Sequence, residues 1–270
     1  DTTLINQATS TETICVKREE TQSRAEDWFR QNDLSLNANK TTTMLFSLKN
    51  SDVPPDFTTS AQFLGIHLDA KLTWKVHGDE LANRISKNLF VLRSLKNKVS
   101  YQVLRTAYFA LCESHLRYCI LTWGHASICN RIFRLQRRAI RILAGIGYRD
   151  DCRSYFTSLR ILTLPSIYIL NSLLHLKLNI NNHMRHKDIH SYNTRHNAAL
   201  LPNFVRLKRN QSFNYYSVKF YNKLSESTQN LGIKQFKRQI SDYLIKNAFY
   251  NYYEFLSVTS VIVPPSNVLT

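Results

Sequence analysis

The scarcity of glycine and proline is the feature that most limits what this chain can fold into. Only 6 Gly and 6 Pro occur among 270 residues, and a chain with so few of them makes few tight turns. Hydrophobic residues make up 43% of the sequence, which is enough for a packed core. Neither G-x-G-x-x-G nor G-x-x-x-x-G-K-[ST] is present, so the motifs of dinucleotide-binding and P-loop folds are excluded. We expect a folded, helix-rich chain.

Charge is distributed unevenly along the sequence. Residues 1–70 contain 6 Lys and Arg against 10 Asp and Glu, whereas residues 71–270 contain 30 against 9. A strongly basic body predicts a polyanionic partner, most often nucleic acid, with an anionic membrane surface as the weaker alternative. No apolar run is long enough to span a bilayer. The five cysteines form no C-x-x-C pair, which argues against a zinc or disulfide framework and favours an intracellular location.

Periodicity places the expected elements. Residues 13–32 have a helical pattern with Ile14 and Trp28 among the inward positions, and residues 41–46 and 62–69 read as strands. Beyond Trp74 the pattern becomes helical, first with an apolar stripe of Leu81, Ile85, Leu89 and Leu92. Further helices are expected at about 101–123 and 127–144, and near 165–180, 212–223 and 233–250. Residues 181–210 are polar and irregular.

The helix expected at 127–144 gives the clearest sign of a polyanion partner. Its arginines at i, i+3, i+7 and i+10 share one face: Arg131, Arg134, Arg138 and Arg141. An apolar stripe lies about 100° round the same helix: Ile132, Leu135, Ala139 and Ile142. Planar guanidinium groups in a row suit backbone phosphates. The alternative is a solvated arginine face paired with neighbouring carboxylates, but few of these lie nearby in the sequence.

A series of short motifs follows in order along the chain. The motifs are Asp1-Thr2-Thr3-Leu4-Ile5, Trp28 with Asn32-Asp33-Leu34-Ser35-Leu36-Asn37, Lys40-Thr41 with Phe46, Phe63-Leu64-Gly65-Ile66-His67-Leu68-Asp69 with Leu72-Thr73-Trp74, Tyr118 with Trp123-Gly124, Leu135-Gln136-Arg137-Arg138-Ala139-Ile140-Arg141 and Tyr192-Asn193-Thr194-Arg195. In this order they resemble the second half of non-LTR retrotransposon reverse transcriptases of the jockey-like kind. The first resembles the end of the polymerase box F/Y-A-D-D-T, cut between its two aspartates. Each is weak alone, but their order makes the resemblance specific, and it extends to about residue 250.

The resemblance implies an α+β fold in three parts. Residues 1–70 would be the C-terminal remnant of the palm, with a helix, strands and a primer-grip hairpin. Residues 71–180 would form a helical thumb, and residues 181–270 a polar linker with a helical C-terminal extension.

The resemblance also implies roles for single residues. Asp1 would match the second carboxylate of the metal-binding pair, and Lys40 would belong to the box whose lysine protonates the pyrophosphate leaving group. Phe63, Leu64 and Gly65 would grip the primer end. Arg195 would join the nucleic-acid contacts, with the four arginines described above.

The function that follows is that of part of an RNA-directed DNA polymerase from a transposable element. Its partners would be an RNA template, a DNA primer and the missing N-terminal half of the polymerase, and the parent element would act in nucleus and cytoplasm. The complete enzyme would use Mg²⁺. The alternative is a stand-alone basic nucleic-acid-binding module without catalysis.

Polymerisation by this chain alone is not expected. Nucleotidyl transfer by two Mg²⁺ ions needs several converging carboxylates, and only Asp1 matches one of them, so the chain should bind no Mg²⁺ by itself. Residues 148–151 fit Y-x-D-D letter for letter, but they follow an arginine-rich helix and come far after Lys40, so we read them as a loop. His183, His186 and His190 share a spacing that could suggest a metal face, yet intervening cations favour solvated or phosphate-facing histidines.

Overall fold

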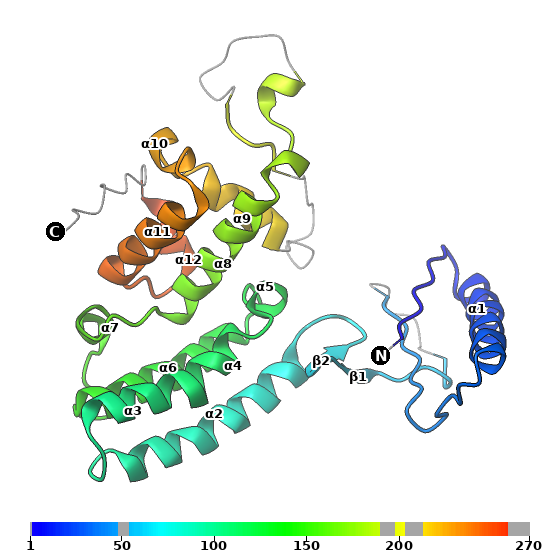
Figure 1. The fold of residues 1–270 in the computed structure, drawn as a ribbon, viewed down its shortest axis with the longest axis horizontal. Helices are drawn as coiled ribbons and strands as arrows, with labels where there is room; N and C mark the ends of the chain where they lie inside the picture. Colours follow the sequence, from blue (N-terminus) through cyan, green and yellow to red (C-terminus); the bar gives the residue numbers. More distant parts are fainter. Residues whose placement is uncertain (1, 48–53, 190–197, 203–212, 259–270) are drawn as a thin grey trace. The chain divides into compact units, whose positions relative to one another are not determined.

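The computed structural model describes residues 2–47, 54–189, 198–202 and 213–258. The chain divides into two compact units, Asp1–Ala61 and Gln62–Thr270. Within the described residues, helices predominate and a single two-stranded sheet is present (Figure 1). This agrees with the predicted α+β class.

The first unit contains one long helix and little core. Helix α1 (Thr11–Gln31) begins after Ser10, whose hydroxyl accepts a hydrogen bond from the Thr13 N–H at 3.2 Å. The expected helix is therefore present, but none of its residues is buried, and Trp28 is exposed rather than inward. Among the described residues of this unit, Phe57 is the buried apolar side chain. A unit with so small a core cannot cover the apolar residues of α1.

The expected strand at residues 41–46 is wrong. The described part of this segment makes only a single bridge, between Met44 and Thr58. The strand preference of β-branched residues depends on packing against neighbouring strands, and among the described residues no regular strand lies alongside this segment.

The expected strand at residues 62–69 is a hairpin instead. Strands β1 (Ser60–Phe63) and β2 (Ile66–Asp69) are joined by Leu64 and Gly65, with φ values of 47° and 77°. Positive φ at both central residues defines the two-residue turn that matches strand twist. The regular alternation of Leu64, Ile66 and Leu68 concealed this turn in the sequence.

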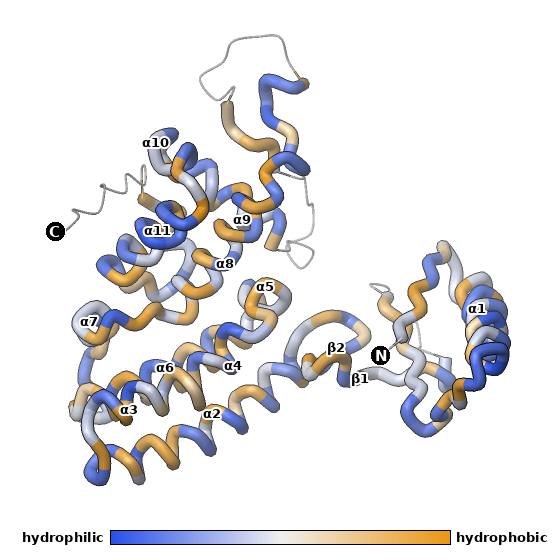
Figure 2. The backbone as a smooth tube through the Cα atoms, in the orientation of Figure 1, coloured by the Kyte–Doolittle hydropathy of each residue, from blue (hydrophilic) through white to orange (hydrophobic). Residues whose placement is uncertain are grey.

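Helix α2 (Lys75–Leu95) is connected to the hairpin by a side-chain cap. The Asp69 carboxylate accepts hydrogen bonds from the main-chain N–H groups of Thr73 and Trp74, each at 2.8 Å. These bonds satisfy donors at the helix start that have no partner within the helix. The predicted stripe of α2 is confirmed, because all four of its members are buried. Apolar and polar residues alternate along α2 in Figure 2.

The expected helix at 101–123 is present in pieces. It consists of α3 (Tyr101–Tyr108), a π-helical turn η1 (Phe109–Glu113), α4 (Ser114–Arg117) and α5 (Ile120–Trp123). Cys119 has a left-handed φ of 46°, which separates α4 from α5. The Trp123 indole donates to the Tyr118 carbonyl at 3.0 Å and closes this break. Neither Gly nor Pro marks it in the sequence.

Helix α6 (Cys129–Ala144) lies along α2 and ends at Gly145, whose φ of 73° is the left-handed conformation common after a last turn. A Cβ on Gly78, near the start of α2, would lie 2.0 Å from an Ile128 side-chain carbon at the start of α6. At the other end, the Lys96 ammonium lies beside Gly145. The two helices therefore run side by side in the same direction.

The remaining helices follow α6 in the chain, and α8 has the most extensive packing among them. They are α7 (Arg153–Ser158), α8 (Leu164–Leu178), η2 (Ile180–Asn182), η3 (His186–Asp188), α9 (Phe213–Tyr221), α10 (Glu226–Gln229), α11 (Ile233–Asn247) and α12 (Tyr252–Ser257). Helix α8 is apolar on all sides and packs on α6, α9 and α11, as expected of a core helix. The helices expected near 165–180, 212–223 and 233–250 are confirmed, whereas α7, α10 and α12 were not predicted.

Helix α8 packs on both α6 and α11, so residues before and after position 180 belong to one compact unit. The division into palm remnant, thumb and extension stays a prediction. In the part of the chain that the structure describes, no helix has the length and apolar character needed to cross a membrane.

Candidate nucleic-acid interface

The arginine face of α6, formed by Arg131, Arg134, Arg138 and Arg141, is directed to solvent. The first three side chains are exposed and the fourth is half-buried. The opposite stripe is in the core: Ile132, Leu135 and Ala139 are buried, and Ile142 is half-buried. Burial of one face thus fixes the direction of the other, as the periodicity predicted.

Most of the charge on this face is not neutralised by carboxylates. Arg131 pairs with Asp79 of α2. Arg138 donates to the Tyr148 hydroxyl at 2.7 Å, and Arg141 Nε donates to the Asp150 carbonyl at 2.8 Å. Arg134 makes no hydrogen bond or ion pair within the described residues. Three of the four guanidinium groups therefore keep donors and charge for a ligand.

Arg137 belongs to the same helix but to a different environment. Its guanidinium lies 5.2 Å from the Phe133 ring centre and 5.5 Å from that of Tyr250. Arg153 approaches the Tyr250 ring at 4.1 Å and pairs with Glu254 at 3.2 Å. Burial raises the pKa of Tyr250, which keeps its hydroxyl neutral. These contacts join α6 to α7 and α12 and are structural.

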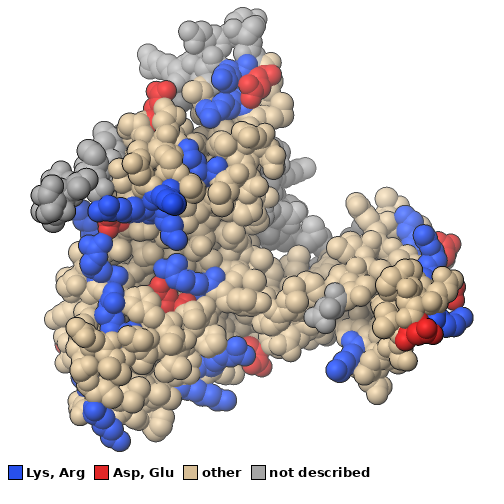
Figure 3. Space-filling model, viewed as in Figure 1, with Lys and Arg blue, Asp and Glu red and all other residues tan. Residues whose placement is uncertain are grey.

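The sequence reasoning missed a second basic surface, on α11. Its exposed cations are Lys234, Lys237, Arg238 and Lys246. Figure 3 shows basic side chains gathered on one face of residues 62–270, including the region of α11, with few acidic side chains among them. The sequence Lys-Gln-Phe-Lys-Arg at 234–238 has a net positive charge, and this charge could have identified the basic surface of α11 from the sequence.

The hairpin turn exposes apolar side chains and is held from a distant segment. Phe63 and Leu64 are exposed. The Tyr118 hydroxyl donates a hydrogen bond to the Leu64 carbonyl, and a Cβ on Gly65 would lie 3.7 Å from the Tyr118 ring. The three residues expected to form the primer grip are therefore adjacent at one turn, and Tyr118, which the sequence reasoning had not assigned, supports that turn.

Other expected site residues lie elsewhere. Lys40 is exposed in a turn of the first unit, where its N–H donates to the Asn37 carbonyl at 3.0 Å. Asp1, Arg195 and His190 lie outside the described residues. The described residues contain no group of three or more His, Cys, Asp or Glu that could hold a metal ion. The described residues therefore do not fit an Mg²⁺ site.

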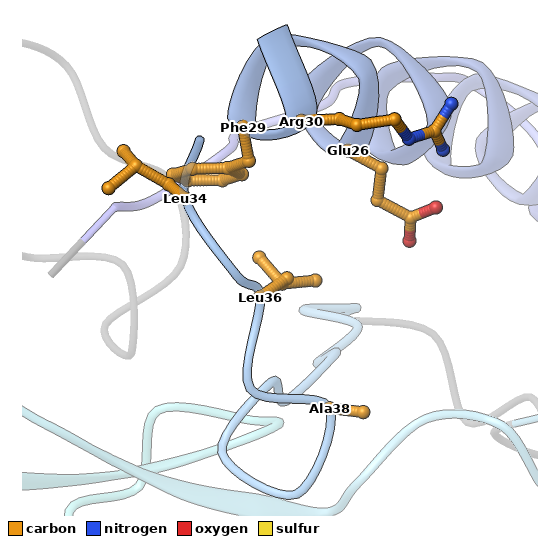
Figure 4. Close-up of a pocket in the computed structure, with 6 residues that line it drawn as sticks. All are labelled: Glu26, Phe29, Arg30, Leu34, Leu36 and Ala38. Atoms are coloured by element: carbon orange, nitrogen blue, oxygen red, sulfur yellow. The ribbon is translucent and has the colours of Figure 1, made fainter. Parts of the chain in front are cut away.

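The first unit also contains a shallow pocket of about 370 Å³. Phe29 of α1, together with Leu34 and Leu36 from the segment after it, forms its apolar side (Figure 4). Glu26, Arg30 and Ala38 complete the lining. Its two charged residues are engaged along α1, where Glu26 accepts from Gln22 and Arg30 pairs with Asp27, so they do not converge as in a small-molecule site. The apolar lining belongs to the incompletely covered surface of this unit.

The loop reading of residues 148–151 is confirmed. The Asp150 carboxylate accepts from the Gly147 N–H at 2.7 Å, and the Asp151 carboxylate accepts from the Arg153 N–H at 3.2 Å. Each carboxylate is engaged by the main chain of its own loop, so the two do not converge on a shared site.

Comparison with known proteins relates the chain to transposon polymerases. It is 26% identical over 136 residues to the probable RNA-directed DNA polymerase from transposon X-element of Drosophila melanogaster, covering 45% of this chain and 15% of that protein. It is 32% identical over 136 residues, with the same coverage, to the probable RNA-directed DNA polymerase from transposon BS of the same organism. Both matches thus cover about 15% of the relative's length.

No family model matches the chain, and no solved structure matches it. The two similarities support the expected relationship to reverse transcriptases of transposable elements. The jockey-like assignment stays a prediction.

Proposed function

We propose that this chain is part of a transposon RNA-directed DNA polymerase in which residues 62–270 bind the template–primer nucleic acid. The observation that carries this proposal is the solvent-directed arginine face of α6, in a chain similar to two such polymerases. The partners are an RNA template, a DNA primer and the N-terminal half of a polymerase. The site of action is the nucleus and cytoplasm, where such an element is copied and integrated.

The arginine face suits a phosphate backbone better than it suits a protein partner. Ten residues separate Arg131 from Arg141 in the sequence, which corresponds to about 15 Å along a helix. Guanidinium groups offer planar pairs of donors that match phosphate oxygens. Contacts of this kind position a duplex without reading its sequence.

The hairpin supplies a second contact in this proposal. Phe63, Leu64 and Gly65 hold the primer end, with Leu64 and Gly65 at positive φ so that the turn is tight and its main chain accessible. Asp1 and Lys40 keep the roles implied by the resemblance, as a metal carboxylate and a proton donor in the complete enzyme, which uses Mg²⁺.

Salt dependence tests nucleic-acid binding directly. The chain is titrated into a fluorescently labelled RNA–DNA hybrid duplex at several salt concentrations, and anisotropy gives the dissociation constant. Each phosphate contact contributes about one unit to the slope of log affinity against log salt, so Arg134→Ala with Arg138→Ala should lower that slope by about 2. Affinity should fall most at low salt.

Arg24→Ala with Arg30→Ala is the matched control, since both are exposed arginines of α1 in the first unit. This pair removes the same charge and should leave the slope close to that of the unmodified chain. Equal slopes for both double variants and the unmodified chain would refute the role of the α6 face.

A further inference from the structure

The loop after α6 is a fixed turn that presents Tyr148. The Asp150 N–H donates to the Gly147 carbonyl at 3.3 Å, and the Gly147 N–H donates to the Asp150 carboxylate at 2.7 Å. A Cβ on Gly147 would lie 2.9 Å from that carboxylate, so a larger residue there would displace the Asp150 side chain. Tyr148 and Arg149 occupy the two central positions of the turn.

The turn is also tied to the arginine face. Arg141 Nε donates to the Asp150 carbonyl at 2.8 Å, and the Ile146 N–H donates to the Arg141 carbonyl at 3.2 Å. Ile146 packs against the core. The position of the turn relative to α6 is therefore set by main-chain and side-chain hydrogen bonds, and not by the turn alone.

Tyr148 continues the arginine face beyond the end of the helix. Its side chain is 65% exposed, and the Arg138 guanidinium lies 5.2 Å from its ring centre while donating to its hydroxyl at 2.7 Å. An exposed aromatic ring held by an arginine of a basic row has the composition of a base-stacking platform. Because Arg138 already fixes the orientation of the Tyr148 ring, less conformational entropy would be lost when a base binds.

The charge around Tyr148 favours a base over a phosphate. Asp150 and Asp151 lie within the next three positions, and each carboxylate accepts a hydrogen bond from a main-chain N–H group, which holds it in the loop. They offset the positive charge of Arg138 and Arg149 beside the ring, and the neutral face of a base needs no net positive charge to stack there. Phosphate contacts therefore belong to α6 and base stacking to the turn.

We infer that Tyr148 stacks on an unpaired base of the bound nucleic acid, next to the backbone contacts of the α6 arginine face. The inference rests on the proposed nucleic-acid binding and specifies that the bound ligand includes an unpaired nucleotide beside the duplex. The ligand is thus a duplex with a single-stranded extension, and the site reads no particular base, because every base has a face that can stack.

Two hybrid probes of equal duplex length test the inference with the 270-residue chain. One is blunt, and the other has a short single-stranded extension whose first unpaired position carries 2-aminopurine, whose fluorescence falls on stacking. Tyr148→Ala should weaken binding of the extended probe by about 5- to 100-fold and abolish the fluorescence decrease. Binding of the blunt probe should be unchanged.

Two variants separate stacking from other effects. Tyr148→Phe keeps the ring and loses the hydroxyl, so it should retain the fluorescence decrease. Tyr253→Ala removes a tyrosine that is 62% exposed on α12 and should behave as the unmodified chain. Circular dichroism of Tyr148→Ala reports whether the fold is intact.

The outcomes distinguish the two proposals. Salt-dependent binding of both probes, with no difference between Tyr148→Ala and the unmodified chain, overturns the stacking inference and leaves the proposed function standing. Absence of salt-dependent binding to either probe overturns both. Selective loss of binding to the extended probe in Tyr148→Ala, with the fluorescence decrease retained in Tyr148→Phe, supports the inference.

Discussion

Gln136 shows how a single polar side chain joins separate parts of the second unit. It is fully buried, and its amide donates to the Tyr108 hydroxyl at 3.0 Å and the Leu162 carbonyl at 2.9 Å. Its carbonyl accepts from the Leu164 N–H at 2.7 Å. The side chain thus connects α6 with α3 and with the start of α8, and all of its hydrogen-bonding partners lie in the core.

Replacing Gln136 should be costly. Gln136→Leu keeps the approximate volume but leaves the Leu164 N–H, the Leu162 carbonyl and the Tyr108 hydroxyl without this partner. Unsatisfied buried groups cost about 1–3 kcal/mol each, so with three such groups we expect a loss of at least about 3 kcal/mol in the free energy of unfolding, measured in urea. Gln102→Leu, at an exposed position of α3, should change it by less than about 0.5 kcal/mol. Similar values for both variants would contradict this account.

His77 gives the fold a dependence on pH. It is buried near the start of α2, with its ring 5.7 Å from that of Trp123. Burial, followed by the charges of His67 and Arg84, lowers the pKa of His77. The folded state therefore binds a proton less readily than the unfolded state. The stability that the neutral side chain contributes is present above the unfolded pKa, near 6.5, and is lost as the pH falls through the lowered value.

Urea midpoints at about pH 7.5 and pH 5.5 test this direction. The unmodified chain should lose stability at the lower pH, and His77→Phe should lose less. His77→Phe should still lose some stability at the lower pH, because burial also lowers the pKa of His125. Identical losses in the two proteins would show that His77 does not contribute.

At the scale of elements, the hairpin turn depends on a tyrosine more than fifty positions away in the chain. Tyr118→Phe removes the hydrogen bond to the Leu64 carbonyl and keeps the ring beside Gly65. A hydrogen bond of this kind contributes about 0.5–1.5 kcal/mol, so the main-chain amides of residues 60–69 should exchange about 2- to 10-fold faster. Hydrogen–deuterium exchange measures this.

Tyr101→Phe is the appropriate comparison, since Tyr101 is exposed at the first position of α3. It should leave hairpin exchange unchanged. If Tyr118→Phe also leaves it unchanged, the turn is maintained by its own main chain, and Tyr118 is not its support.

The elements differ in how well the sequence predicted them, for physical reasons. Helix α6 was predictable because its apolar stripe, its arginine face and Gly145 all indicate the same helix and the same end. The break at Cys119 was not, because no Gly or Pro marks it: the Trp123 indole bonds to the Tyr118 carbonyl across it, and Tyr118 contacts the distant hairpin. The turn at Leu64 was hidden because Leu64, Ile66 and Leu68 alternate in the sequence as in a single strand, and Leu is not a residue that usually marks such a turn.

The parts of the candidate site also differ in how well the sequence predicted them. The arginine face could be predicted from residue spacing within one helix. The contact of Tyr118 with the hairpin and that of Arg138 with Tyr148 depend on which elements meet, and spacing contains no information on that. The inward position predicted for Trp28 was wrong for a related reason. A helical pattern identifies an apolar position but does not show whether another element covers it.

At the scale of the whole molecule, we expect no polymerisation by the chain alone. Two-metal nucleotidyl transfer needs several carboxylates around the ions, and only Asp1 matches a member of that set. The purified chain, incubated with a primed RNA template, nucleotides and Mg²⁺, should extend the primer no further than a reaction without protein. A commercial reverse transcriptase in the same buffer is the positive control. Extension products above background would contradict the expectation.

The cap at Asp69 and the parallel packing of α2 on α6 have a consequence for how such a chain can change in length. Hydrogen bonds of Asp69 attach the hairpin to the start of α2. Helix α2 lies beside α6 along its length, from Gly78 to Lys96. One residue inserted in α2 would turn everything before it by about 100° and shift it by 1.5 Å. The hairpin would then face a different direction from the arginines of α6. Insertions are tolerable in the loops between helices, whereas within α2 only those close to whole helical turns would keep the two surfaces in register.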